Sequence, residues 1–321
     1  MSRKKRVGAE AIANAHADTS TEMFTMSSLQ PSQIQRLRAP SPSHHPKPKN
    51  YEFAQQKLKQ LQGYLNNTAW QRLHENQLPQ QDIICGNLNL STAQCTSGKS
   101  FLQLMSDRNT ERFWHAVNGC KVKGLPEPDR TPTENFFNAK ILFNLFQSCL
   151  WAYNDDDKPQ PFIEGSSWER HKLSSFEFNK LSNLNYGKNQ WHVPWLLKIK
   201  AQPHHGGLPH INCFLKLEHR LEENFLLFSE VWVILMVTFL VQEWRSHKLS
   251  EIVPVTIVSL SYRQVRIVQG YVDGNTRKVM MNKSRILDLE KGQKIDDIWH
   301  EVSTITRWFL GTPVDLSRKT A

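Results

Sequence analysis

The sequence predicts an α+β protein with a mostly helical N-terminal half and a three-stranded antiparallel meander near the C-terminus. Apolar residues recur at helical spacing in the first half of the folded part. An uninterrupted apolar run lies at 231–241, and β-branched segments follow it from 253 to 281. Helices and strands are thus segregated along the chain, which favours an α+β fold over a doubly wound parallel sheet.

Residues 1–50 differ in composition from the rest of the chain. They are rich in Ser, Pro, Ala and Gln, and the segment APSPSHHPKPK at 39–49 cannot bury enough apolar surface to offset the entropy lost on ordering. They also hold eight Lys or Arg residues against three acids, which is half of the formal net charge of +10. We therefore expect a disordered basic tail at 1–50, with weak nonspecific attraction to nucleic acid, and a single globular α+β domain at 51–321.

Helices are predicted at three places before the strands. Phe53, Leu58 and Leu61 begin the folded part at helical spacing. Thr131 and Glu134 form a capping box that opens a second helix, which runs to about Tyr153. The apolar run at 231–241 has 11 residues, too few to span a bilayer, so it predicts a buried core helix, and no membrane span is favoured.

The meander follows that buried helix. Strands are expected at 253–260, 265–272 and 277–281, and Asp273-Gly274 supplies residues tolerant of positive φ for the second hairpin. Apolar residues from Ile295 to Phe309 recur on one helical face, which predicts a closing amphipathic helix. We expect the buried helix and the closing helix to pack against the meander.

The cysteines and the N-terminus bear on compartment. Five cysteines, Cys85, Cys95, Cys120, Cys149 and Cys213, are an odd number without regular spacing, so a disulfide framework is not indicated. The basic residues Arg3–Arg6 are not followed by the apolar stretch of a secretory signal. These features predict a cytoplasmic or nuclear protein that is not secreted.

The segment PHHGGLPHINC at 203–213 contains the strongest candidates for chemistry. His204, His205 and His210 are competent zinc or copper ligands, although adjacent histidines tend to point apart and the spacing matches no zinc pattern. A Gly/Pro loop with surface histidines is the favoured interpretation, and a metal site is the alternative. No cofactor is expected.

Two other patterns have weaker functional interpretations. Cys95–Ser100 ends like a phosphate-binding loop, but Ala93 stands where the first glycine is needed, so a capped helix start at Ser97 or Ser100 is favoured. Arg263 and Arg266 could face a polyanion, but strand alternation places them on opposite faces. The strand segment that contains Arg263 and Arg266 is therefore predicted to form the centre of a sheet and not the base of an active site.

The segments PVTIVSLSYRQVRIVQGYVDG and ITRWFLGTPV resemble an orphan family of uncharacterised filamentous-fungal proteins. That family shares an apolar strand beginning Pro-Val, an Arg-Ile-rich strand ending Tyr/Phe-x-Asp-Gly, and a closing Trp-Phe-Leu-Gly, and the resemblance covers about residues 251–314. Ser261–Gln264 replaces a more glycine-rich connection. The resemblance implies a fungal lineage and an association with secondary-metabolite genes, without a known activity.

The sequence therefore predicts a soluble, noncatalytic interaction or accessory protein with an unknown protein partner. Two alternatives remain open. One is an enzyme with an unrecognised site, metal-assisted through His204, His205 and His210, and the other is a weak nucleic-acid binder that acts through its basic tail.

Overall fold

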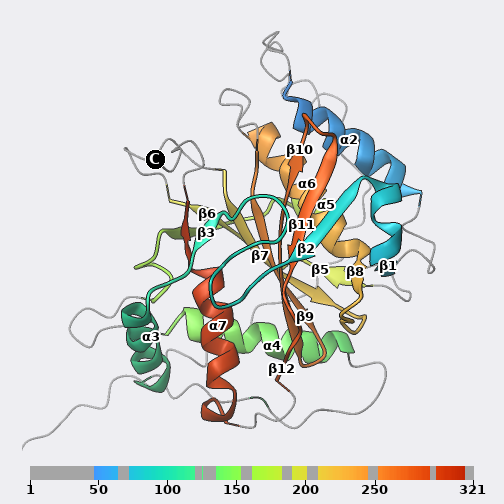
Figure 1. Ribbon diagram of the computed structural model, residues 1–321. Coiled ribbons are helices and arrows are strands. Elements are labelled where there is room, and N and C mark those ends of the chain that lie inside the picture. The colour runs from blue at the N-terminus through green and yellow to red at the C-terminus, as the bar shows by residue number, and fades with distance from the viewer. Residues whose placement is uncertain are drawn as a thin grey trace, which may run out of the picture. The chain divides into compact units, whose positions relative to one another are not determined.

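A mixed sheet of nine strands forms the centre of the fold in the computed structural model (Figure 1). The structure describes residues 47–63, 72–119, 125, 135–152, 161–182, 190–200, 209–244, 252–289 and 294–314. The strands of this sheet are β2 (Ile83–Asn87), β4 (Trp168–His171), β5 (Trp191–His192), β6 (Leu196–Ile199), β7 (Ile211–Leu217), β9 (Val255–Ser261), β10 (Gln264–Asp273), β11 (Lys278–Lys283) and β12 (Leu287–Asp288).

The strand order combines antiparallel and parallel neighbours. It runs β2–β11–β10–β9–β7–β6–β4, while β5 pairs with β7 and β12 pairs with β10. Strand β2 is parallel to β11, and β7 is parallel to β9, whereas the other pairs are antiparallel. Two small sheets join β1 (Arg72–His74) to β8 (Phe225–Leu227) and β3 (Leu102–Gln103) to β13 (Thr312–Pro313).

Helices cover both faces of the large sheet and divide the core into two clusters (Figure 1). On one face α6 (Phe228–Trp244) packs on β9 and β10, with α2 (Lys49–Gln62) and α5 (Ser175–Leu181) against it. On the other face lie α4 (Asn135–Leu150) and α7 (Trp299–Phe309), and α3 (Asp107–Gly119) packs against α7. Strands β7 and β9 are buried along their whole length because helices cover them on both sides.

The predicted architecture is wrong. The segments expected as a three-stranded antiparallel meander are three neighbouring strands of a nine-stranded mixed sheet, and the first half of the chain, expected to be mostly helical, supplies β2 and two short strands of the smaller sheets. Strand β2, with the sequence IICGN, buries only its first residue, so it lacks the alternation that identifies a strand. Its pairing comes from β11, which no local pattern reveals.

The two hairpins of β9, β10 and β11 close differently from expectation. Tyr262 occupies the left-handed region, with φ of 53°, in the connection where glycine was expected. In the second connection Arg277, not Asp273 or Gly274, has a positive φ of 53°. Gly274 is needed for another reason: a Cβ there would lie 2.2 Å from the backbone nitrogen of Asn50, at the start of α2. The Oδ1 atom of Asp273 accepts from the backbone N–H groups of Asn275 and Thr276, which shapes the turn.

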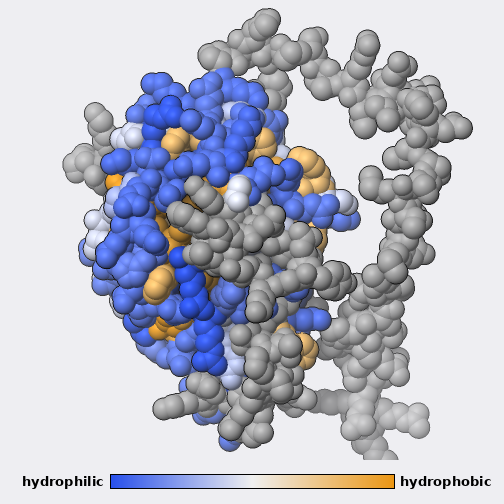
Figure 2. Space-filling view, turned by 90° about the vertical axis from the view of Figure 1, so that its right-hand side faces the viewer, coloured by the Kyte–Doolittle hydropathy of each residue, from blue (hydrophilic) through white to orange (hydrophobic). Residues whose placement is uncertain are grey.

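The apolar helix α6 is buried along most of its length. Gly270 of β10 lets it approach the sheet, because a Cβ at that position would lie 2.7 Å from the Cδ1 atom of Ile234. Within the described ranges, no helix combines the length and the hydropathy needed to cross a bilayer. Figure 2 shows mainly hydrophilic residues on the described surface of one side of the molecule, with hydrophobic residues in separate areas.

Candidate functional site

The candidate site is a cavity of about 460 Å³ beside the C-terminal ends of β2 and β11. Its three walls come from stretches of chain that are distant in sequence: the end of β2 with the segment after it, the end of β11 with the segment after it, and one face of α7. A fourth stretch, just before β8 (Phe225–Leu227), adds Glu223. Among the described residues, three cationic side chains and one carboxylate line the cavity, together with a histidine and several amides and hydroxyls. The lining residues are Asn87, Leu88, Asn89, Leu90, Ser91, Glu223, Lys283, Ser284, Arg285, His300, Thr304 and Arg307.

Lys283, the last residue of β11, and Arg285 form one wall of the pocket. The Nζ atom of Lys283 lies 2.9 Å from a carboxylate oxygen of Glu75 and also donates to the backbone carbonyl of Glu223. Arg285 is exposed, and its guanidinium forms no ion pair and donates no hydrogen bond within the described part of the chain. Arg285 is therefore the cation of this pocket that is most available to a ligand.

The polar face of α7 forms the second wall. His300, Thr304 and Arg307 are spaced at i, i+4 and i+7, so they lie on one side of the helix. The Nε atom of Arg307 donates to the backbone carbonyl of Met105 at 3.0 Å, and its Nη2 atom lies 3.1 Å from a carboxylate oxygen of Asp107. Because the Asp107 side chain is 87% exposed, this ion pair is weak and can yield to a bound anion.

Residues 87–91 form the third wall, and backbone hydrogen bonds hold them in place. The backbone N–H of Leu88 donates to the carbonyl of Lys283 at 2.9 Å, which ties this segment to the wall after β11. The Oδ1 atom of Asn89 accepts from the backbone N–H groups of Ser91 and Thr92. The indole N–H of Trp308 donates to the carbonyl of Leu90 at 2.9 Å, which ties the segment to α7.

Several side-chain donors on the pocket surface are not used by the protein itself. Five lining side chains have donors that meet no acceptor among the described residues, namely those of Asn87, Asn89, Ser91, Arg285 and His300. The hydroxyls of Ser284 and Thr304 donate to nearby backbone carbonyls. The carboxylate of Glu223, the acid of the lining, accepts from the backbone N–H of Ile286 at 2.8 Å. Such a lining suits a ligand rich in anionic acceptors.

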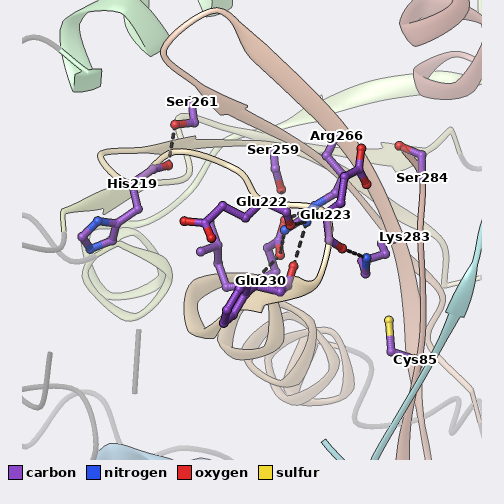
Figure 3. Close-up of polar contacts among 12 residues, drawn as sticks. Cys85, His219, Glu222, Glu223, Glu230, Ser259, Ser261, Arg266, Lys283 and Ser284 are labelled. Atoms are coloured by element: carbon purple, nitrogen blue, oxygen red, sulfur yellow. Dashed lines mark hydrogen bonds and ion pairs between the residues drawn. The ribbon is translucent and has the colours of Figure 1, made fainter. Parts of the chain in front are cut away.

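A buried ion pair beneath the pocket fixes the segment that carries Glu223 (Figure 3). Both the Glu230 and Arg266 side chains are fully buried, with 2.6 Å between Oε2 and Nη2. Ser259, which faces Arg266 across β9 and β10, donates to Oε1 of Glu230 at 2.7 Å. The Nη1 atom of Arg266 donates to the backbone carbonyls of Glu222 and Phe225 at 3.0 and 2.8 Å. The chain on both sides of Glu223 is therefore held by the sheet.

The predicted metal ligands fall in different environments. His210 is 1% exposed and lies between the rings of Phe101 and Trp168, and burial lowers the pKa of its imidazole to about 3. His204 and His205 lie outside the described residues. Among the residues that the structure describes, no three His, Cys, Asp or Glu side chains are grouped to hold a metal ion. The proposed three-histidine site thus stays a prediction.

The expected helix start at Ser97 or Ser100 is wrong. No helix begins before α3 at Asp107 in this part of the described chain. Ser97 instead exchanges hydrogen bonds with Asn282 of β11, at 3.1 Å from its backbone nitrogen to Oδ1. The hydroxyl of Ser100 donates to the carbonyl of Ala93, which has a positive φ of 58°. The segment is a loop that packs on the sheet, because side-chain hydrogen bonds and not helical capping satisfy its backbone.

The described thiols are poorly suited to nucleophilic catalysis. Burial raises the pKa of Cys85 to about 12 and that of Cys95 to about 11. Burial also raises the pKa of Cys149 and Cys213, on α4 and β7. These four cysteines are free thiols, and each is protonated near neutral pH, where the thiolate would be the reactive form.

Sequence reasoning missed both the pocket and the ion pair beneath it. The helical spacing identified the apolar face of the closing helix. The same spacing places His300 and Arg307 together on the opposite, polar face, so this wall of the pocket could have been identified from the sequence. Arg266 was considered as a possible contact for a polyanion, whereas it is fully buried against Glu230. No local signal pairs these two charges, since 36 positions separate them.

No protein-family model, curated protein or solved structure matches this chain. The resemblance to filamentous-fungal proteins therefore stays a prediction.

Proposed function

We propose that this protein is a noncatalytic binding protein that recognises an oxyanion ligand, such as a phosphorylated molecule, in the basic pocket. The observation that carries the proposal is the donor-rich lining: Arg285 and the side chains of Asn87 and Ser91 have no protein acceptor among the described residues. A planar guanidinium with free donors can bind a phosphate or carboxylate through two parallel hydrogen bonds.

The electrostatics of the pocket support an anion over a neutral ligand. Lys283, Arg285 and Arg307 line the cavity with Glu223 as the carboxylate, and His300 stands beside them. Glu223 accepts a backbone hydrogen bond, which offsets part of its repulsion of an anion. An incoming oxyanion can exchange with the exposed carboxylate of Asp107 at Arg307, where binding would break only a weak ion pair. Lys283 is buried and stays engaged with Glu75 and the carbonyl of Glu223, so it contributes its charge to the pocket.

The chemistry of the lining favours binding over catalysis. The hydroxyls of Ser284 and Thr304 donate to backbone carbonyls and not to a general base. In the described part of the chain the thiols have raised pKa values. We place this accessory or interaction protein in the cytoplasm or nucleus, which the four free thiols support because such compartments keep cysteines reduced.

Isothermal titration calorimetry with pyrophosphate tests the proposal. Arg285→Gln should weaken pyrophosphate binding about tenfold or more, because it removes a charge-assisted hydrogen bond. The matched control is Lys278→Gln, which removes the same charge from the opposite end of β11, outside the pocket. Equal affinities for the wild type, Arg285→Gln and Lys278→Gln would show that pyrophosphate binds elsewhere and would overturn the proposal.

A further inference from the structure

Cations stand on two separate walls of the basic pocket. Lys283 is the last residue of β11 and Arg285 follows it, whereas Arg307 projects from α7 beside His300. Each wall can hold an oxyanion group by itself, because each combines a permanent cation with further donors. A ligand with two anionic groups, one at each wall, would use this arrangement more fully than a single phosphate.

The third wall differs from the other two because its donors are uncharged. Asn87, Asn89 and Ser91 present side-chain amides and a hydroxyl, and these groups donate to no other described residue. Amides and hydroxyls can both donate to and accept from a sugar hydroxyl, whereas a purely phosphate ligand offers them acceptors alone. This wall therefore fits a hydroxylated portion between the two anionic groups.

The lining lacks the surfaces that a nucleobase needs. Among the described residues, His300 contributes the one aromatic ring of the lining. The apolar contribution is from Leu88, which is buried, and Leu90, which is partly buried. Bases bind proteins chiefly by stacking on aromatic rings, with arginine guanidinium planes as a second platform, so this lining supports a nucleobase less well than it supports hydroxyls and phosphates.

From these three walls we infer that the ligand of the pocket is a small polyhydroxylated molecule with two phosphate groups, in the class of sugar bisphosphates. The inference rests on the proposed function, because it specifies the ligand of the same pocket. The cavity of about 460 Å³ lies in the range of small-molecule sites. The hydroxyls of the ligand would contact residues 87–91, and its phosphates would contact the two cationic walls.

Calorimetry with two matched probes tests this ligand class. Fructose 1,6-bisphosphate and hexane-1,6-diol bisphosphate carry the same two phosphates on six-carbon frameworks, but only the first has hydroxyls. The wild type should bind the sugar bisphosphate about tenfold more tightly, the effect of one or two additional hydrogen bonds. In the double variant Asn87→Ala/Ser91→Ala the ratio of the two affinities should fall to about one.

The outcomes separate this inference from the proposed function. If both probes bind equally to the wild type and Arg285→Gln weakens both, the pocket binds phosphates but the polyol inference is overturned. If neither affinity responds to Arg285→Gln, the proposed function itself fails. Adenosine diphosphate binding more tightly than fructose 1,6-bisphosphate would overturn the sugar class in favour of a nucleotide. Thermal unfolding of each variant, compared with Lys278→Gln, establishes that the lost binding is not lost folding.

Discussion

Replacing Arg266 with methionine should destabilise the protein by about 3–5 kcal/mol, the usual cost of removing one partner from a buried ion pair. The structure places the change at the upper part of this range for two reasons. Both side chains of the pair are fully buried, so Glu230 would keep a carboxylate that water cannot reach. The substitution would also remove the guanidinium donor from the carbonyls of Glu222 and Phe225, which accept from Arg266 at 3.0 and 2.8 Å, and Glu222 would keep the backbone N–H of Phe225 at 3.3 Å.

Urea denaturation followed by tryptophan fluorescence measures this loss as a shift of the unfolding midpoint. Lys198→Met is the matched control, because Lys198 pairs with Glu169 at 3.2 Å on two half-exposed side chains and should cost at most about 1 kcal/mol. The double variant Glu230→Met/Arg266→Met should be more stable than Arg266→Met, since it leaves no isolated charge. An Arg266→Met variant as stable as Lys198→Met would refute the assignment of a buried ion pair.

Three further results are expected. Burial lowers the pKa of His210 to about 3, so below pH 6.5 the unfolded chain takes up a proton that the folded protein does not. His210 alone should therefore lower stability by about 2 kcal/mol from pH 7 to pH 5, and His210→Leu should reduce the slope measured in urea titrations by that amount, while buried His192 keeps its own contribution. Gly274→Ala should destabilise the fold by about 1–3 kcal/mol, because its methyl group would meet the backbone of α2. Gly63→Ala should be neutral or slightly stabilising by differential scanning calorimetry, because a Cβ there would meet the carbonyl oxygen of Gln60 at an ordinary contact distance of 3.8 Å. Iodoacetamide at pH 8 should label the partly buried Cys95 faster than Cys213 in the native protein, and it should label both cysteines rapidly in urea. Equal labelling rates of the two cysteines in the native protein, measured by mass spectrometry, would contradict the buried position of Cys213.

The sequence indicated individual elements better than their assembly. The apolar run at 231–241 lies inside α6, and the β-branched segment from 253 lies at β9, because burial on all sides removes polar residues from both. The parallel pairing of β2 with β11 has no such local signature, since strand β2 is mostly partly buried and its partner is far away in the sequence. The overall sheet could therefore not be predicted from periodicity.

The candidate site was harder to predict than the fold. Its walls are joined by contacts such as the hydrogen bond from Trp308 to Leu90, which spans 218 positions. Each wall alone looks like an ordinary solvated segment, and only the pairing of β2 with β11 and the packing of α7 bring the cations together. The histidine-rich segment had a stronger local signal, yet His210 lies in an apolar environment where desolvation disfavours the charged imidazolium.

The parallel pair of β2 and β11 also constrains how the chain acquires its structure during synthesis. Strand β2 leaves the ribosome well before β11, the strand that it must join, because α6 and most strands of the large sheet lie between them in the chain. The whole segment between them must therefore be made before this side of the sheet can close, and contacts of such sequence separation form slowly. Until then β2 has an unpaired backbone edge, which exposes the nascent chain to aggregation.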